Sequence, residues 1–315
     1  MGKLHISSTP HIHQKGSSTR NIMLDVVIAM LPAAVAGVII FGIKALWVIL
    51  TCVISSVLAE ALFNLCVHKK QTVGDFSAVV TGLLLALNLS TNVPLWQCVV
   101  GSVFAIVVVK CLFGGLGKNI VNPAITARVF MLLTFSATVA GGAAPVAAEL
   151  TSSATPLVTL NQGAKASEGV KLLDLFLGNH AGAIGETCAL ALLIGFVYLV
   201  ARKVIKWYVP ASYAATVFAC YFLFEGFSAT FALQHVLAGG LLLGAIFMAT
   251  DYVTTPVTNL GRIVFCIGCG LITFLIRFNT EDLYPEGVSI SILVMNLLVP
   301  FIEKFTAKKT LGGIK

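Results

Sequence analysis

Charged residues are scarce in this sequence, and a soluble domain of this length could hardly do without them. Only 10% of the 315 residues are charged and 58% are hydrophobic, whereas soluble domains average roughly 25% charged residues. The apolar residues gather in runs that can cross a hydrocarbon layer, which takes about 20 residues. We therefore expect a polytopic membrane protein with membrane lipid around it, and we take the net charge of +7 as no sign of a nucleic-acid partner.

Motifs for several kinds of chemistry are missing as well. The stretch 113–119 resembles a nucleotide-binding loop, but Leu112 stands where the first glycine belongs and Asn119 replaces the magnesium-binding hydroxyl. Cys266 and Cys269 form a C-x-x-C without further ligands nearby, so no metal site is expected. No nucleophile, base and acid can be placed together, and no catalytic residue is predicted.

Ten apolar segments predict ten transmembrane helices and an all-α fold. The first run is too long for the core of a signal peptide and indicates a retained helix. The predicted spans are 21–41, 45–67, 74–89, 95–112, 119–136, 183–201, 207–225, 231–250, 261–278 and 287–303. The division is a terminal segment 1–20, a first five-helix repeat 21–136, a loop 137–182, a second five-helix repeat 183–303 and a tail 304–315.

The basic residues orient these spans. With the N-terminus in the cytoplasm, only four of the 20 Lys and Arg residues fall in outer segments, namely Lys44, Lys165, Lys171 and Arg277. Cytoplasmic loops carry an excess of Lys and Arg in most membrane proteins. Both termini are therefore expected in the cytoplasm, and the loop 137–182 on the periplasmic or extracellular side.

An odd number of spans per half would place two related halves in opposite orientations. A faint similarity at an offset of 163 residues pairs the stretch 82–88 with 245–251, and each stretch ends in a polar residue followed by a proline-containing turn. The pattern predicts two five-helix inverted repeats. Such repeats usually carry broken helices and a functional site near the middle of the membrane.

Polar residues in or beside the spans are candidates for that site, because a charge in lipid is unfavourable. Asn122-Pro123 predicts a helix start whose N–H groups favour an anion, and Arg128 follows one to two turns later. Asp251 ends a predicted span, and Asp75 begins one. For three others, Glu60, Arg277 and Asn296, we expect helix-end anchors or helix–helix hydrogen bonds.

One hydroxyl-rich strip, 151–157, lies in the outer loop. Pro156 favours an extended conformation at Thr155, which would expose that side chain to a modifying enzyme. Spacing alone also fits an ordinary Ser/Thr-rich surface loop.

The strip Ser152-Ser153-Ala154-Thr155-Pro156-Leu157 resembles the flavin-attachment site of membrane subunits in respiratory electron-transport complexes. Segments 122–130 and 286–300 are also similar to theirs. Their order, the ten-span layout and the length resemble the RnfD family, the D subunits of Rnf ion-translocating electron-transport complexes, which is related to the B subunit of the sodium-pumping NADH:quinone reductase. Two positions depart from the motif: Glu149 stands where relatives often have Asp, and Ser153 where many have Gly.

The resemblance implies FMN bound covalently to Thr155 through a phosphoester, attached by a flavin transferase, in a bacterial inner-membrane protein that works with the other Rnf subunits. It implies electron relay from ferredoxin to NAD with translocation of Na⁺ or H⁺. Relatives hold a second, non-covalent riboflavin, for which Asn122, Arg128 and Asp251 are candidate contacts, although Asp75 and Asp251 would equally suit ion movement. Lys165 and Lys171 are candidate partners of the FMN phosphate.

Two other functions stay open at this point. An inverted-repeat channel or secondary transporter without redox function fits the architecture alone. A scaffold that only holds partner subunits would fit the apolar helices as well.

Overall fold

The computed structural model describes residues 18–146, 156–161, 170–224, 228–279 and 287–307. The predicted flavin-attachment residues Ser152, Ser153, Ala154 and Thr155 lie outside these ranges, as does Lys165. All regular elements in the described ranges are helices, and one isolated β-bridge joins Ala143 to Gly182. The predicted all-α class is confirmed.

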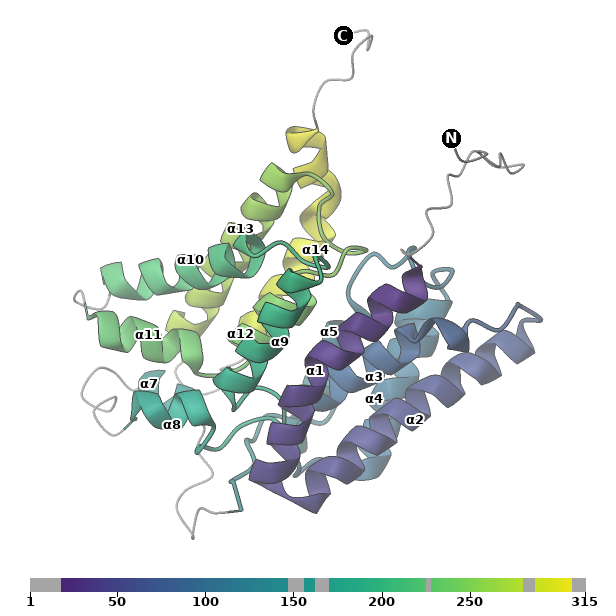
Figure 1. Cartoon of the computed structure of the whole chain (residues 1–315), viewed down its shortest axis with the longest axis horizontal. Helices are drawn as coiled ribbons and strands as arrows, with labels where there is room; N and C mark the ends of the chain where they lie inside the picture. Colours follow the sequence, from purple (N-terminus) through teal and green to yellow (C-terminus); the bar gives the residue numbers. More distant parts are fainter. Residues whose placement is uncertain (1–17, 147–155, 162–169, 225–227, 280–286, 308–315) are drawn as a thin grey trace, which may run out of the picture.

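The first half and the loop supply the elements up to α8 (Figure 1). They are α1 (Thr19–Phe41), α2 (Ile43–Cys66), η1 (Val73–Asp75), α3 (Ser77–Leu87), α4 (Leu95–Val103), the π-helix η2 (Phe104–Cys111), α5 (Pro123–Thr134), α6 (Ser136–Val139), α7 (Pro156–Asn161) and α8 (Leu172–Leu177). The second half contains α9 (Ala189–Ala201), α10 (Tyr208–Phe224), α11 (Ala229–Leu237), α12 (Leu241–Leu243), the π-helix η4 (Gly244–Met248), α13 (Asn259–Asn279) and α14 (Gly287–Thr306).

Four helices, α1, α2, α13 and α14, are individually long and apolar enough to cross a membrane. Five shorter apolar helices coincide with further predicted spans: Ser77–Leu87, Leu95–Cys111, Pro123–Thr134, Ala189–Ala201 and Tyr208–Phe224. The chain is therefore a multi-pass membrane protein. The predicted span at 231–250 corresponds to a bent pair of helices, because the helix breaks after Leu237 and resumes at Leu241 at an angle of 67°. Gly239, whose φ is +69°, supplies the left-handed turn at that break.

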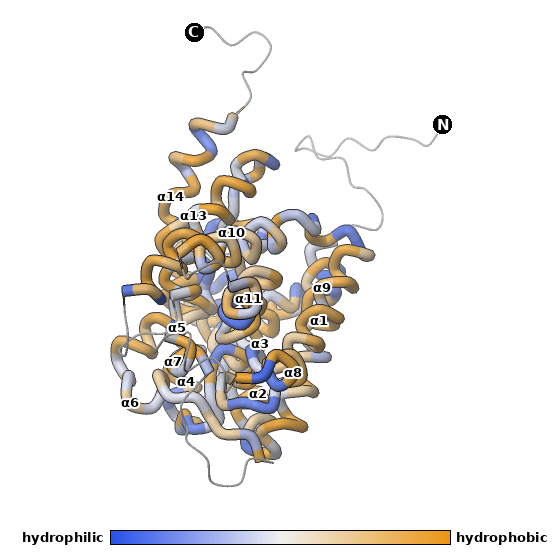
Figure 2. Tube along the Cα trace, turned by 90° about the vertical axis from the view of Figure 1, so that its left-hand side faces the viewer, coloured by the Kyte–Doolittle hydropathy of each residue, from blue (hydrophilic) through white to orange (hydrophobic). Residues whose placement is uncertain are grey.

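The short helices occupy the interior, and the long ones face outward. Nine of the eleven residues of α3 are buried, which includes the continuous run Gly82–Leu87. By contrast, Ile39 on α1 is 76% exposed and Leu62 on α2 is 60% exposed. Figure 2 shows the apolar colouring along these outer helices. Such side chains are stable on the outside of a protein only against lipid or another apolar partner.

The two halves follow the spacing expected of a repeat. The second-half helices α10, α12, α13 and α14 begin 164 or 165 residues after their counterparts, which start at Ile43, Ser77, Leu95 and Pro123. This spacing agrees with the sequence offset of 163. Helix α11 has no helical counterpart of its length in the described part of the first half. In Figure 1 the two halves lie side by side, joined by contacts between α1 and α9 and between α5 and α14.

The α1–α9 contact depends on Gly195. A Cβ atom at Gly195 would clash with the backbone oxygen of Ala29 on α1. Near the end of the same contact, the Arg202 guanidinium donates from Nη2 to the Asp25 carboxylate at 3.2 Å, and the Tyr198 hydroxyl donates to it at 2.9 Å. Close packing and an ion pair therefore hold the halves together.

Two of the basic residues are buried in the interior of the protein. Lys110 and Arg128, which the topology assigned to cytoplasmic segments, are buried inside η2 and α5, at 1% and 3% exposure. Their positive charges are compensated by protein groups rather than by water.

Candidate functional site

Two of the pockets between the halves of the molecule are lined by candidate site residues. We name them after one lining residue each: the Pro156 pocket and the Asp251 pocket. Residues from both repeats line each pocket. Their empty volumes, which include the open space at the mouth of each pocket, are about 670 Å³ and about 760 Å³.

Two buried arginines line the Pro156 pocket. Arg128 comes from α5 and donates to the Val139 carbonyl oxygen at 3.3 Å. Arg277 comes from the last turn of α13, and donates to the carbonyl oxygens of His235 at 2.7 Å and Ala238 at 3.3 Å. Two guanidinium groups in one cavity make the site attractive to an anion, above all to a phosphate.

Glycines leave room beside these charges. Gly141, Gly142, Gly239 and Gly240 all line the Pro156 pocket. A Cβ atom at Gly239 would lie 3.2 Å from Arg277 Nη2, and one at Gly240 would lie 3.1 Å from Glu186 Oε2. Side chains at either position would fill the space in front of the charged groups.

His180 and Glu186, from the turn before α9, add to the polar lining. The His180 ring nitrogen Nδ1 lies 3.1 Å from the Ala181 carbonyl oxygen, and Nε2 has no partner among the described residues. Burial lowers the pKa of His180, so the imidazole is neutral at pH 7. Glu186 accepts a hydrogen bond from the Ala183 N–H at 2.9 Å, which orders this turn.

The Asp251 pocket lies where α1, α3 and α5 begin and η4 ends. It is lined by Asn122, Asp251, Lys110 and Asn119, together with apolar side chains such as Leu84 and Phe247. A mainly apolar cavity with a few polar groups is the usual form of a cofactor site. Asn122 and Asp251, which the sequence singled out separately, thus line one pocket.

Asn122 is held by hydrogen bonds of its own. Its side-chain oxygen accepts from the N–H groups of Ala124 at 3.0 Å and Ile125 at 3.4 Å, and Pro123 occupies the first turn of α5. The predicted helix start is confirmed. These bonds use the N–H groups that were expected to attract an anion, so capping is the role the geometry gives Asn122.

Asp251 lies in the turn after η4. Its carboxylate accepts hydrogen bonds from the Val253 N–H at 3.2 Å and the Thr254 hydroxyl at 3.1 Å. Burial raises the pKa of the Asp251 carboxyl, and these two hydrogen bonds oppose that shift. Desolvation similarly raises the pKa of the neighbouring Tyr252 to about 12.

The two pockets approach each other through α3 and α5. Leu84 lines the Asp251 pocket and Asn88, one turn later on α3, lines the Pro156 pocket. On α5, Pro123 lines the Asp251 pocket and Arg128 lines the Pro156 pocket. One helical turn advances about 5.4 Å, so only a thin layer of side chains separates the cavities along these helices.

The residues predicted from the sequence do not all line the same pocket. Arg128 was grouped with Asn122 and Asp251, but it lines the other pocket, next to Pro156. Arg277 was expected to be a helix-end anchor or to make a helix–helix hydrogen bond. Its hydrogen bonds to the end of α11 fit the second expectation, and it also lies buried in the Pro156 pocket. The charge of Arg277 could have drawn attention to it in the sequence, whereas no local pattern indicates the surroundings of His180.

Similarity to known proteins extends over nearly the full length of the chain. Residues 5–312 match the model of the NQR2, RnfD, RnfE family. The chain belongs to this family. The matched residues include both pockets and the loop 137–182, so the resemblance noted in the sequence is not confined to a few motifs.

Curated relatives align over a similar extent. The D subunit of the Na⁺-translocating ferredoxin:NAD⁺ oxidoreductase complex of Acetobacterium woodii is 47% identical, over 99% of this chain and 96% of the relative. The D subunit of the proton-translocating ferredoxin:NAD⁺ oxidoreductase complex of Clostridium ljungdahlii is 39% identical, over 98% and 96%. The D subunit of the ion-translocating oxidoreductase complex of Stutzerimonas stutzeri is 36% identical, over 94% and 93%.

These names bear on the alternatives left open by the sequence. All three relatives are subunits of ion-translocating oxidoreductase complexes. They favour a redox subunit over a channel or secondary transporter that works alone. They differ in the ion they name, so similarity alone does not assign Na⁺ or H⁺ to this chain.

Proposed function

We propose that this chain is the D subunit of an ion-translocating ferredoxin:NAD⁺ oxidoreductase complex and carries FMN bonded to Thr155 through a phosphoester. Family membership and the relatives' names support the complex. The resemblance of the strip 152–157 supports the flavin. The observation that carries the assignment is the position of Pro156, the residue after Thr155, in a pocket with two buried arginines.

The residues of the Pro156 pocket fit the charge and shape of such a group. A phosphoester at Thr155 is anionic, and Arg128 and Arg277 would offset its charge together with the negative charge of a reduced flavin. The glycines at 141, 142, 239 and 240 would allow a flat ring to approach the backbone. The neutral His180 would add a hydrogen-bonding group without adding charge.

Bound FMN would supply the redox chemistry, exchanging electrons one or two at a time. The protein's part is to hold the group, orient it and exclude water. A covalent bond prevents dissociation, which matters most if the Thr155 loop lies on the periplasmic or extracellular side and both termini are cytoplasmic, as the charge pattern predicts. A flavin transferase would be needed to form the bond.

The Asp251 pocket suits a second, non-covalent flavin such as riboflavin. Its apolar walls would pack against an isoalloxazine ring, and Asp251 and the amide of Asn119 would supply hydrogen bonds. The thin layer between the pockets would bring two such rings close together. This arrangement supports a relay in which electrons pass from one flavin to the other within this protein.

The covalent bond is tested by in-gel fluorescence. The denatured chain, produced in cells that contain a flavin transferase, should fluoresce under ultraviolet light. Thr155→Val should abolish the band, whereas Thr151→Val, in the same strip, should leave it unchanged. A dark wild-type band, or a fluorescent Thr155→Val band, would contradict the attachment.

A further inference from the structure

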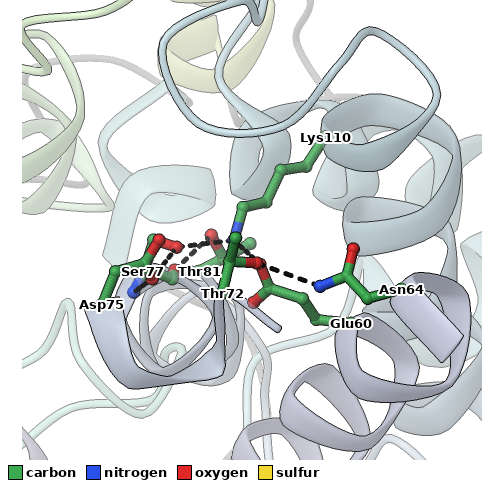
Figure 3. A network of polar contacts seen from close by, with 7 residues as sticks. All are labelled: Glu60, Asn64, Thr72, Asp75, Ser77, Thr81 and Lys110. Atoms are coloured by element: carbon green, nitrogen blue, oxygen red, sulfur yellow. Dashed lines mark hydrogen bonds and ion pairs between the residues drawn. The ribbon is translucent and has the colours of Figure 1, made fainter. Parts of the chain in front are cut away.

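A second polar cluster lies inside the first repeat, away from the Pro156 pocket (Figure 3). At its centre, the Lys110 ammonium donates to Glu60 Oε1 at 3.0 Å and to the Ser77 hydroxyl at 2.6 Å. Lys110, Glu60 and Ser77 are 1%, 2% and 3% exposed. A buried ion pair of this kind is stable only when each charge finds full hydrogen bonding.

Glu60 Oε1 is well supplied, since the Thr72 hydroxyl also donates to it at 2.6 Å. The Asn64 amide in turn donates to Thr72 at 3.0 Å. Glu60 Oε2, by contrast, has no hydrogen-bond partner among the described residues and is fully buried. Leaving a buried acceptor without a hydrogen bond is unfavourable, and more so for a charged group.

A second unpartnered oxygen lies on the same face of α2. Ser56 is one turn before Glu60, and its hydroxyl, fully buried, has no partner in the described ranges either. Side chains four residues apart on a helix are neighbours, with Cβ atoms about 5–6 Å apart. Glu60 Oε2 and Ser56 Oγ are therefore placed to share one small ligand.

Only a glycine of α3 fits beside Ser56. A Cβ atom at Gly82 on α3 would lie 2.8 Å from Ser56 Oγ. The neighbouring hydroxyl Ser55, in contrast, donates to the Thr51 carbonyl oxygen at 2.6 Å and is satisfied in the ordinary way for a helix. The unpartnered state of Ser56 is thus a property of this position.

The charges of Lys110 and Glu60 limit which ligand can bind at this position. The Lys110 ammonium already neutralises Glu60, so a cation added beside both would leave an uncompensated buried charge. Lys110 also lines the Asp251 pocket, where Asp251 supplies a second carboxylate. It lies on the π-helix η2, a type of segment found frequently at functional sites. Asp75, through Ser77, is the other acidic group of the cluster.

We propose that Glu60 and Ser56 bind a small monovalent cation, Na⁺ or a proton, and that Lys110 is an internal counter-ion displaced by it toward the Asp251 pocket. Exchange of one cation for another keeps the buried charge constant. This inference rests on the ion-translocating part of the proposed function and is independent of the flavin at Thr155. It places an ion site of the complex within the first repeat.

The test uses the purified complex and Ser56→Ala beside the matched Ser55→Ala. The Na⁺ concentration at half-maximal ferredoxin:NAD⁺ oxidoreductase rate should rise about tenfold in Ser56→Ala, which corresponds to about 1.4 kcal/mol of lost binding. It should stay unchanged in Ser55→Ala. Lys110→Met should lower the same concentration, because the competing cation is gone, and Glu60→Gln should abolish the Na⁺ response.

If the wild-type rate does not depend on Na⁺, the pH midpoint of the rate replaces it. Ser56→Ala should then move the midpoint to lower pH and Lys110→Met to higher pH. The proposal is overturned if Ser56→Ala and Ser55→Ala behave alike in both assays, a comparison that does not depend on Lys110→Met or Glu60→Gln folding. Flavin fluorescence of the band separates this outcome from a failure of the flavin proposal, because these variants keep Thr155.

Discussion

The backbone N–H of Asn122, at the start of α5, meets the side-chain amide of Asn296, in α14. With that amide oriented so that both ends find partners, its oxygen accepts from Asn122 at 3.2 Å and its nitrogen donates to the Thr254 carbonyl oxygen at 3.0 Å. One buried side chain therefore ties the first repeat to the turn that carries Asp251. This bridge fixes two walls of the Asp251 pocket relative to each other.

Replacing Asn296 by Leu should destabilise the protein. The change removes both hydrogen bonds and leaves a buried N–H and a buried carbonyl unpaired, which costs about 1–3 kcal/mol for each group. Thermal unfolding in detergent should show a clear drop in midpoint. Asn279→Leu is the control, because Asn279 is exposed and its amide bonds only to its own helix. Equal midpoints for the two variants would argue against the bridge.

Gly195→Ala should weaken the contact between the halves. The added methyl group would clash with the Ala29 backbone oxygen, so α1 and α9 must separate. Overpacking of this kind costs about 1–3 kcal/mol, occasionally more. Gly74→Ala is a matched control, since nothing lies within 4 Å of a Cβ atom there. The unfolding midpoints of both variants, measured in one detergent, provide the comparison.

Asp251 should make stability depend on pH. Burial raises its pKa in the folded protein, so the folded state binds the proton more tightly than the unfolded chain. The ionised Asp251 carboxylate therefore destabilises the folded state. This destabilisation is absent at pH values below the unfolded pKa of 3.8 and is complete once the pH has risen through the folded pKa. Asp251→Asn should therefore unfold at a higher temperature than wild type at pH 7, with the difference shrinking toward pH 4. A constant difference across that range would contradict the assignment.

Arg277→Met should change the flavin's potential while leaving its attachment in place. As an order of magnitude, removing one positive charge from a pocket that would hold a reduced, anionic flavin costs about 2 kcal/mol at an effective dielectric constant of about 20. For a two-electron couple this lowers the midpoint potential by roughly 40 mV. Spectroelectrochemical titration of the purified complex measures the shift. Arg20→Met, at the other end of the fold, should leave the potential unchanged.

Hydropathy was enough to predict the helices, because each predicted span contains an apolar helix and lipid requires backbone hydrogen bonds to be satisfied within the segment. The Asn-Pro pair likewise predicted the start of α5, since capping depends on adjacent residues. The break after Leu237 was missed, because the apolar run continues through Gly239 and Gly240. Hydropathy averaged over a sequence window does not reveal a left-handed turn inside such a run.

The site was harder to predict than the fold. The partners of Lys110 are 33 and 50 residues away along the chain, and those of Arg277 are 39 and 42 residues away. No local pattern encodes such contacts. Asn122 and Asp251 were found because a polar residue at the end of an apolar segment stands out, but which pocket each residue lines became clear only from the packing of the two halves.

The central claim is that Thr155 carries FMN, and intact mass of the purified chain tests it most directly. Chain from cells containing the flavin transferase should exceed its sequence mass by one FMN less one water. Cleavage of the phosphoester should return it to the sequence mass, and Thr155→Val should show no increment before or after cleavage. A wild-type chain at its unmodified mass, from a complex that still transfers electrons from ferredoxin to NAD⁺, would contradict the account.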